Sequence, residues 1–259
     1  MRLDQYLVLN NYFKTRSKAT DAIKKGAVIV DGKKIDKPSY DIENAKIEIT
    51  NDVCPYVSRG GYKLEAAIKE FMLDFKDKKV LDIGASTGGF TDCSLKHGAS
   101  LVYSVDVGEN QLDLSLKNDL RVRSFEKTNI KDFNLSDKVD YIVMDVSFVS
   151  IEYLLPSIVK FINEENSFIC LIKPQFELGG MKFKGGIVKD KNLHKKVLDN
   201  VISELSKYNL GIKKLIPSPI LGGDGNKEFL ALIKLNIKTN INVLEVIKWL
   251  KNYLLRILL

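Results

Sequence analysis

The sequence is poor in the residues that mark disulfide-rich and zinc-binding proteins. Its 259 residues include only three cysteines, Cys54, Cys93 and Cys170, and no C-x-x-C pair. An odd number of isolated cysteines indicates neither a disulfide framework nor a zinc site. We therefore expect thiols that are buried in a reducing compartment, and no bound metal.

Long apolar runs are also missing. No stretch reaches the roughly 18 uninterrupted apolar residues of a membrane-spanning helix, and the first residues include Asp4 and lack the apolar core of a secretory signal. A cytoplasmic protein is the expectation. Residues 241–259 show a basic amphipathic pattern, which could lie on a membrane surface, although packing on the domain core is favoured.

The composition is that of an ordinary globular protein, with 45% hydrophobic and 28% charged residues. The length allows one large core and a small accessory unit. Lys and Arg number 40 and the net charge is +7, which favours an anionic partner. Because the lysines are scattered, a general lysine bias explains the charge as well, so charge alone decides little.

Residues 80–90 predict a buried parallel strand, a glycine-rich loop and a helix that starts at Phe90. The G-x-x-x-G-G spacing differs from both the dinucleotide fingerprint and the phosphate loop. Asp82 would repel a pyrophosphate but suits a cationic ligand. Asp106 ends the next strand, about 20 residues beyond the first glycine, where a carboxylate can accept both hydroxyls of a ribose. Asp82 and Asp106 together predict a binding site for S-adenosylmethionine. The alternative is that the two acids only cap helices or are solvated at the strand ends.

Further polar residues follow the expected strands 122–125, 141–144 and 167–172. They are Asn129, a candidate for contact with adenine, Asp145 and Lys173. The carboxyl ends of parallel strands form the ligand edge of open α/β sheets, so we expect a doubly wound, Rossmann-like sheet. The predicted cofactor-binding residues are Asp82, Gly84, Ser86, Thr87, Gly88, Gly89, Phe90, Asp106, Asn129 and Asp145.

The first fifty residues have a different pattern. Residues 2–9 and 17–26 predict two short helices, the second with Ser17 as N-cap and Gly26 as C-cap, followed by a small β-unit that ends near Ile49. Basic residues outnumber acids in this small α+β unit, which is typical of phosphate binding. A solvated basic face without a ligand is the alternative.

Four short motifs in this unit resemble the RNA-binding module first described in small-ribosomal-subunit protein S-four. They are Arg2-Leu3-Asp4, Thr15-Arg16-Ser17 with Ala19, Gly26-Ala27-Val28 and Val30-Asp31-Gly32. The resemblance implies an RNA-binding domain over residues 1–50, joined by a linker, residues 51–59, to a second domain, residues 60–259. The predicted RNA-binding residues are Arg2, Lys14, Arg16, Lys18, Lys24, Lys25 and Arg59.

Five further motifs resemble the TlyA family, whose members are rRNA 2′-O-methyltransferases with an FtsJ-like catalytic domain, some also described as haemolysins. The motifs are Ser58-Arg59-Gly60-Gly61-x-Lys63-Leu64, residues 81–90, Asp145-x-Ser147-Phe148, Lys173-Pro174-Gln175-Phe176-Glu177 and Gly225-Asn226-x-Glu228. The resemblance implies a mostly parallel sheet with an antiparallel last strand. It also places the FtsJ-like Lys-Asp-Lys-Glu tetrad on Lys63, Asp145, Lys173 and Glu228.

The chemistry of such an enzyme asks for these residue types. A ribose hydroxyl is a poor nucleophile, so catalysis depends on positioning and on a proton acceptor. We expect a neutral Lys173 to be that acceptor, with Asp145 orienting it. Lys63 and Glu228 would fix the ribose. Burial and Lys63 favour the neutral amine whereas the two acids favour the charged form, so the sequence leaves the outcome open.

The sequence therefore favours an S-adenosylmethionine-dependent methyltransferase, and family resemblance implies a cytidine ribose in ribosomal RNA or in ribosomal subunits. A membrane-active cytolysin is the main alternative. The missing secretion signal, the missing membrane-spanning segment and the complete tetrad argue against it. An RNA-binding assembly factor whose methylation is incidental is a weaker alternative. The modified nucleotide, the form of the RNA and the oligomeric state are left open.

Overall fold

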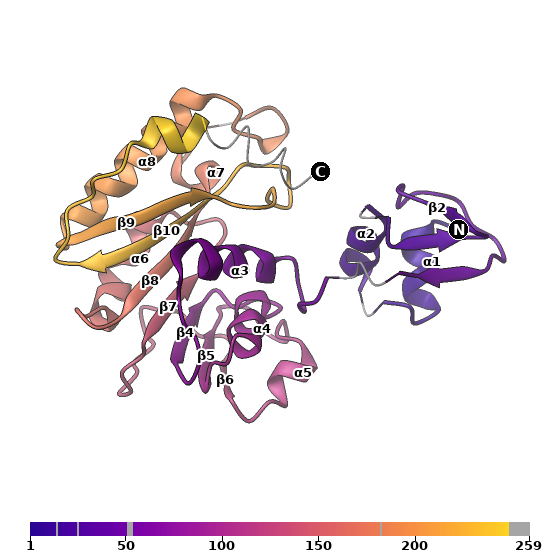
Figure 1. Cartoon of the computed structure of the whole chain (residues 1–259), viewed down its shortest axis with the longest axis horizontal. Helices are drawn as coiled ribbons and strands as arrows, with labels where there is room; N and C mark the ends of the chain where they lie inside the picture. Colours follow the sequence, from indigo (N-terminus) through magenta and orange to yellow (C-terminus); the bar gives the residue numbers. More distant parts are fainter. Residues whose placement is uncertain (14, 25, 51–53, 182, 249–259) are drawn as a thin grey trace. The chain divides into compact units, whose positions relative to one another are not determined.

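The computed structural model describes residues 1–13, 15–24, 26–50, 54–181 and 183–248. The chain forms two compact units, Met1–Arg59 and Gly60–Leu259, labelled by element in Figure 1. The predicted linker, residues 51–59, belongs to the first unit. The described residues do not include Lys14, Lys25, residues 51–53 of that linker or residues 249–259 of the predicted terminal helix.

The first unit packs two helices on a small antiparallel sheet with strand order β2-β1-β3. Asp31 and Gly32 connect β1 to β2, and both have positive φ, 49° and 75°. This is the backbone of a tight hairpin turn, which an Asp-Gly pair favours. The elements are α1 (Leu3–Leu9), α2 (Arg16–Lys24), β1 (Val28–Val30), β2 (Lys33–Lys34) and β3 (Ile47–Ile49).

The N-terminal end of α2 differs from the prediction. The helix begins at Arg16, so Ser17 lies inside its first turn and is not the N-cap. Thr15 takes that role, since its hydroxyl accepts a hydrogen bond from the Lys18 amide at 3.3 Å. Gly26, with φ at 68°, follows the helix in the left-handed conformation expected of a C-terminal glycine.

Asp4 connects the two helices of the first unit. Its side chain is 2% exposed and accepts hydrogen bonds from Arg2 Nε at 3.0 Å and Arg16 Nε at 2.7 Å. The hydrogen bond from Arg2, opposed by burial and reinforced by Arg16, lowers the pKa of Asp4 to about 2. Arg16 therefore also holds α2 against α1, and Arg2 bonds to the first turn of α1. Both arginines, which are predicted RNA-binding residues, stay about half exposed.

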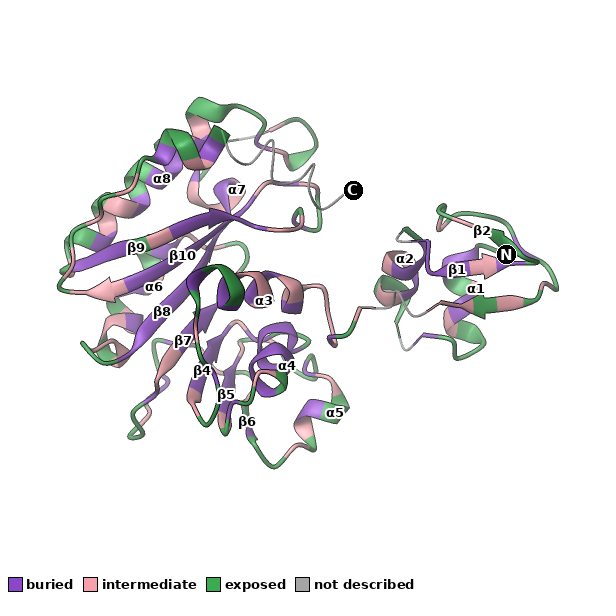
Figure 2. Cartoon of the chain, in the orientation of Figure 1, coloured by how far each residue is buried: buried purple, intermediate pink, exposed green. Residues whose placement is uncertain are grey.

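The second unit contains, within the described residues, a seven-stranded sheet with the order β6-β5-β4-β7-β8-β10-β9. The first five strands in this order run parallel, and β10 runs antiparallel to both β8 and β9, as predicted. Figure 2 shows that the central strands are almost wholly buried. The strands are β4 (Lys79–Ile83), β5 (Leu101–Val105), β6 (Val122–Phe125), β7 (Tyr141–Met144), β8 (Ser167–Ile172), β9 (Leu210–Pro217) and β10 (Phe229–Leu235).

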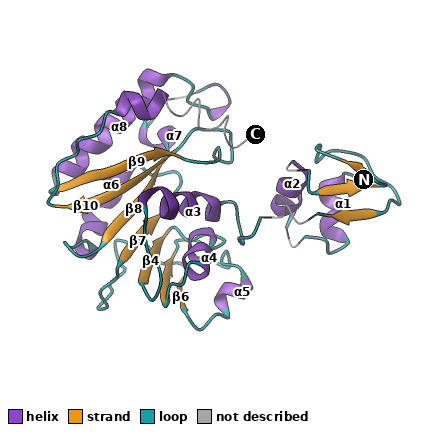
Figure 3. Ribbon diagram, in the orientation of Figure 1, coloured by secondary structure: helices purple, strands orange, loops and turns teal. Residues whose placement is uncertain are grey.

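Helices cover both faces of this sheet (Figure 3). The chain moves from β4 to β5 in one direction and from β7 to β8 in the other, so right-handed crossovers place α4 and α6 on opposite faces. Helix α3 packs with α4, and α8 packs with α6. The helices are α3 (Gly60–Phe71), α4 (Gly89–Lys96), α5 (Leu114–Lys117), α6 (Ile151–Ile158), α7 (Pro174–Glu177) and α8 (Lys191–Ser206), with 3-10 turns η1 (Val159–Phe161) and η2 (Lys184–Gly186).

The reversal of strand order between β4 and β7 defines the ligand edge. In open α/β sheets, ligands bind outside the carboxyl ends of the strands where the order reverses. Here the two strands are direct neighbours, with Ile83 opposite Met144. The residues after them, Gly84 and Asp145, therefore lie at the switch point.

The described part of the predicted terminal helix packs on the core. Residues 243–248 are helical, and Val243 and Ile247 are buried in the core of the second unit. The three cysteines are free, and Cys93 and Cys170 are buried, whereas Cys54 is half-buried.

We expect the Asp4 carboxylate to make the stability of the first unit depend on pH. Its pKa is lowered in the folded state, so its stabilisation is complete above the unfolded pKa of about 3.9 and is lost as the pH falls through about 2. Because both arginines are half exposed, we expect a contribution of about 1 kcal/mol.

Amide hydrogen exchange of α1 and α2 near neutral pH measures this contribution. Asp4→Asn should accelerate exchange several-fold. Asp41→Asn is the control, because Asp41 is 89% exposed and lies 4.0 Å from the terminal amine. Unchanged protection in Asp4→Asn would contradict the role assigned to the carboxylate.

Candidate active site

The glycine-rich loop after β4 is shaped by close packing. Gly84 has a φ of 79°, and a Cβ there would lie 2.8 Å from Val146 Cγ1 and 3.0 Å from the Asp145 carbonyl oxygen. Gly88, with φ at 95°, is the N-cap of α4 and makes no side-chain cap. The amides of Gly84, Ala85, Ser86 and Gly88 are bonded within the protein. The backbone donors available to a ligand are therefore among the first N–H groups of α4, which have no partner within the helix.

Asp106 ties this loop to the end of β5. Its Oδ2 accepts from the Ser86 amide at 2.8 Å and its Oδ1 accepts from the Gly108 amide at 2.7 Å. The first bond holds Ser86 in the left-handed region, with φ at 48°. Each carboxylate oxygen keeps a second lone pair, so this half-buried side chain can still accept from hydroxyl groups of a ligand.

Asp82 lies deeper than the prediction of cofactor contact requires. It is 0% exposed, and its Oδ2 accepts from the Thr91 hydroxyl at 2.6 Å, which lies 2.7 Å from Ser104 Oγ. Burial raises the pKa of Asp82 to about 7. The carboxylate therefore supports the first turn of α4 from beneath, and contact with a ligand would need a rearrangement.

The other predicted cofactor-binding residues differ in how far they are buried. Gly89 and Phe90 are buried and support the loop from inside, whereas Ser86 and Thr87 are exposed at its tip. Asn129 is half-buried, and its side-chain oxygen accepts from the Lys131 amide at 3.1 Å. That oxygen caps the following turn, so a ligand at this strand end would meet the amide nitrogen.

The four predicted tetrad residues lie together at the carboxyl edge. Lys63 Nζ is 2.7 Å from Glu228 Oε2 and 3.7 Å from Asp145 Oδ2, and Lys173 Nζ is 2.6 Å from Asp145 Oδ1. Lys63 comes from α3. The direction of β10 explains the position of Glu228, because an antiparallel strand begins at the edge where parallel strands end, with Phe229 opposite Ile172.

The tetrad is an alternating cluster of charges, of which three are buried. Lys63 and Lys173 are each 7% exposed and Glu228 is 3% exposed. Such charges are costly to bury unless they are paired, and two cations with two anions balance. Asp145 bridges the lysines, and it is also the most accessible member. A ligand at this edge would therefore approach the cluster through Asp145.

Three neighbours without a predicted role complete the site. Ser147 Oγ accepts from Lys173 Nζ at 2.8 Å. Glu177 accepts from Ser150 Oγ at 2.7 Å and from the Ile151 amide at 3.1 Å, and burial raises its pKa. The loops after β7 and β8 are thus bonded together. The Asp-x-Ser-Phe and Lys-Pro-Gln-Phe-Glu motifs were the signal for these contacts.

Phe148 is the third neighbour. Its side chain is 90% exposed, its φ is 64°, and its ring lies 4.9 Å from that of Phe176. A bulky residue with positive φ is an outlier that marks strain or function. The fold therefore presents an aromatic ring to solvent three residues after Asp145 of the tetrad.

Asn226 connects two other loops at this edge. It is 0% exposed, accepts from the Val188 amide at 2.9 Å and donates to the Gly186 carbonyl oxygen at 2.9 Å. These bonds fix the glycine-rich segment before α8 to the turn that precedes Glu228. The Gly-Asn-x-Glu motif therefore has a structural role besides supplying Glu228.

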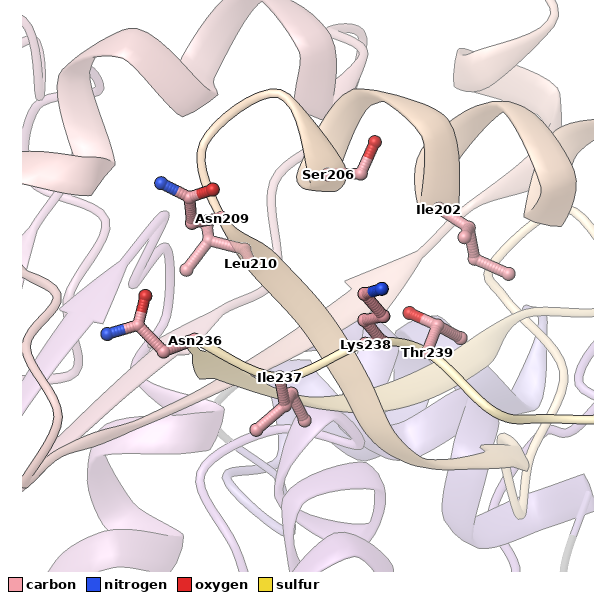
Figure 4. Close-up of a pocket in the computed structure, with 8 residues that line it drawn as sticks. All are labelled: Ile202, Ser206, Asn209, Leu210, Asn236, Ile237, Lys238 and Thr239. Atoms are coloured by element: carbon pink, nitrogen blue, oxygen red, sulfur yellow. The ribbon is translucent and has the colours of Figure 1, made fainter.

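A cavity of about 580 Å³ lies elsewhere in the second unit (Figure 4). It is formed at the start of β9 and after the end of β10, where Leu210 pairs with Leu235. The tetrad lies at the opposite end of β10, so this cavity belongs to a different edge of the sheet. Its lining residues are Ile202, Ser206, Asn209, Leu210, Asn236, Ile237, Lys238 and Thr239.

Within the part of the chain that the structure describes, no three His, Cys, Asp or Glu side chains are grouped as metal ligands. Among the same residues, no helix has the length and apolar character needed to cross a membrane.

We expect the Lys63–Glu228 pair to stabilise the second unit mainly by preventing an unpaired buried charge. Lys63→Met should lower the free energy of unfolding by about 3 kcal/mol, because Glu228 loses its cation. The double variant with Glu228→Gln should recover most of this loss. Thermal unfolding measures both effects. Lys69→Met is the control, since Lys69 is exposed on the same helix; an equal loss there would reject the explanation.

Two family models match the chain. The family described as FtsJ-like methyltransferase matches residues 56–235, and the S4 domain matches residues 1–44. Hemolysin A of Brachyspira hyodysenteriae is 47% identical over 239 residues, which cover 89% of this chain and 98% of the relative.

A second relative carries an enzyme name. The 16S/23S rRNA (cytidine-2′-O)-methyltransferase TlyA of Mycobacterium tuberculosis is 36% identical over 237 residues, with 88% of this chain and 87% of the relative covered. A solved structure described as a hemolysin from Streptococcus thermophilus has a TM-score of 0.78 and 37% identity, covering 99% of this chain and 97% of that one. The chain therefore belongs to the FtsJ-like methyltransferase family, in the group that carries an S4 domain and includes TlyA.

Proposed function

We propose that this protein transfers a methyl group from S-adenosylmethionine to the 2′-hydroxyl of a cytidine ribose in ribosomal RNA. The observation that carries the proposal is the meeting of Lys63, Asp145, Lys173 and Glu228 beside the glycine-rich loop. The relatives named as rRNA (cytidine-2′-O)-methyltransferases support this substrate.

The residues at the switch point fit S-adenosylmethionine. Gly84 lets the loop pack closely against the Asp145 backbone at the switch point, the start of α4 presents backbone donors, and Asp106 can accept from the hydroxyls of the cofactor ribose. When bound, the cofactor supplies an electrophilic methyl group on a sulfonium. Asp145 adds negative charge next to the loop, which favours a cationic ligand.

Lys173 is the proposed proton acceptor. A neutral amine accepts the hydroxyl proton on its lone pair, so the O–H bond breaks and an N–H bond forms. The electron pair left on the ribose oxygen would then bond to the methyl carbon that a bound S-adenosylmethionine supplies, as the carbon–sulfur bond breaks and its electron pair passes to the sulfur. Asp145 stabilises the ammonium that results, since Nζ lies 2.6 Å from its Oδ1. Lys63, fixed by Glu228, would orient the ribose.

The S4 domain supports ribosomal RNA or ribosomal subunits as the partner. Among the predicted RNA-binding residues that the structure describes, Lys24 is exposed and Lys18 is half-buried. Arg2 and Arg16 remain about half exposed to solvent while they donate hydrogen bonds to Asp4. Arg59 Nε lies 3.8 Å from Asp21 Oδ1. These cations can still contact phosphates, which requires no specific base.

Transfer of tritium from labelled S-adenosylmethionine to ribosomal subunits and to naked rRNA tests the proposal. Lys173→Ala should reduce transfer by at least about 100-fold, because it removes the proton acceptor, and calorimetry should show nearly unchanged cofactor binding. Dye release from liposomes is measured in parallel. Release by the wild type without methyl transfer would replace the proposal with a membrane activity, and full transfer by Lys173→Ala would reject the assigned base.

Phe148 should contribute to binding of the RNA substrate. Its exposed ring suits stacking on an unpaired base, which is worth about 1–3 kcal/mol. Phe148→Ala should therefore lower kcat/KM for rRNA about 10-fold or more, whereas Phe148→Tyr, which keeps a ring, should retain most of it. Tyr153→Ala removes another exposed aromatic residue as a control. An unchanged kcat/KM in Phe148→Ala would refute the stacking role.

A further inference from the structure

We propose that Ser147 is a positioning residue that fixes the direction of the Lys173 amine. This inference rests on the proposed function, in which Lys173 accepts the ribose proton. Lys173 Nζ lies 2.6 Å from Asp145 Oδ1 and donates to Ser147 Oγ at 2.8 Å. These are the two polar side-chain contacts that the structure gives to Nζ among the described residues.

The number of hydrogens on the amine decides what these contacts achieve. A neutral lysine amine carries two N–H bonds and one lone pair in tetrahedral directions. Ser147 Oγ accepts one N–H, whereas Asp145 Oδ1 lies at ion-pair distance from Nζ and accepts no hydrogen bond from it. The hydrogen bond to Ser147 is therefore the directional contact that orients the lone pair. With only Asp145 present, the amine would be attracted to the carboxylate but could rotate about its Cε–Nζ bond, and the lone pair would sweep over a cone. Ser147 therefore removes the rotation.

The same arrangement serves the protonated state. After the hydroxyl proton has moved to Nζ, the new N–H occupies the direction that the lone pair held. Ser147 keeps its hydrogen bond and Asp145 stays at ion-pair distance, so neither contact must break during the proton transfer. A site that needs no reorganisation at the moment of reaction is the more effective one.

Ser147 is well suited to this role because other contacts hold its loop. Glu177 accepts from Ser150 Oγ and from the Ile151 amide, and the Asp145 amide donates to the Ile83 carbonyl oxygen at 3.2 Å. The Ser147 side chain is exposed, and Lys173 is the partner that the structure gives to its hydroxyl. Loss of this hydroxyl should thus release the amine without loosening the loop.

The test compares Ser147→Ala, Ser147→Thr and the control Ser150→Ala with the wild type. Ser150 lies in the same loop, but its hydroxyl caps α6 and bonds to Glu177. Ser147→Ala should lower kcat about 10- to 100-fold, with the KM for rRNA unchanged and with cofactor affinity in calorimetry unchanged. Ser147→Thr, which keeps the hydroxyl, should recover most of kcat. Ser150→Ala should lower the melting temperature more than Ser147→Ala does. It should lower kcat less than Ser147→Ala does.

Three results would overturn the inference: a kcat in Ser147→Ala equal to that of the wild type, a failure of Ser147→Thr to recover it, or an equal loss of kcat in Ser150→Ala. The last result would show that order in the loop, rather than the contact with Lys173, limits turnover. Absence of methyl transfer by the wild type would instead reject the proposed function, so the two failures are distinguishable.

Discussion

Four charges at one edge of a sheet, three of them buried, must neutralise each other, and the second unit is built around that requirement. Asp145 is shared between Lys63 and Lys173, and Glu228 supplies the second negative charge. Each charge comes from a different part of the chain, so the balance exists only when α3 and the ends of three strands meet. The reversed direction of β10 is part of this solution, because it delivers Glu228 to the carboxyl edge.

The two halves of the site use different physical means. In the half assigned to the cofactor, backbone conformation dominates: Gly84 allows close packing and Asp106 holds two amides. In the half assigned to proton transfer, side chains dominate, and Ser147 and Glu177 bond the loops after β7 and β8 together. Asp145 lies at the junction, since its carbonyl oxygen faces Gly84 and its carboxylate faces both lysines. A displacement of the loop would therefore disturb both halves.

The strands that flank the site were predictable because buried parallel strands are continuous apolar runs with polar residues at their ends. The bounds of β5 and β8, Leu101–Val105 and Ser167–Ile172, are those predicted. The depth at which each acidic side chain is buried was not predictable. Asp82 and Asp106 both follow the pattern of an acid at a strand end, yet one is 0% exposed and the other is half-buried. Which hydroxyl caps α2 was also ambiguous, since Thr15 and Ser17 are two residues apart and both residue types are good caps.

Residues that violate local preferences were the most informative part of the sequence. A lysine in the first turn of a helix opposes the helix dipole, and Lys63 has this position without a local reason. Its partner is Glu228, 165 residues away in sequence, so the local cost is offset by a contact that only the fold creates. Phe148 also violates a local preference, because a bulky residue rarely adopts its φ of 64°. Where a local rule fails and no local partner exists, the explanation is a non-local contact or a ligand, and both of these residues lie at the edge where the proposed chemistry occurs.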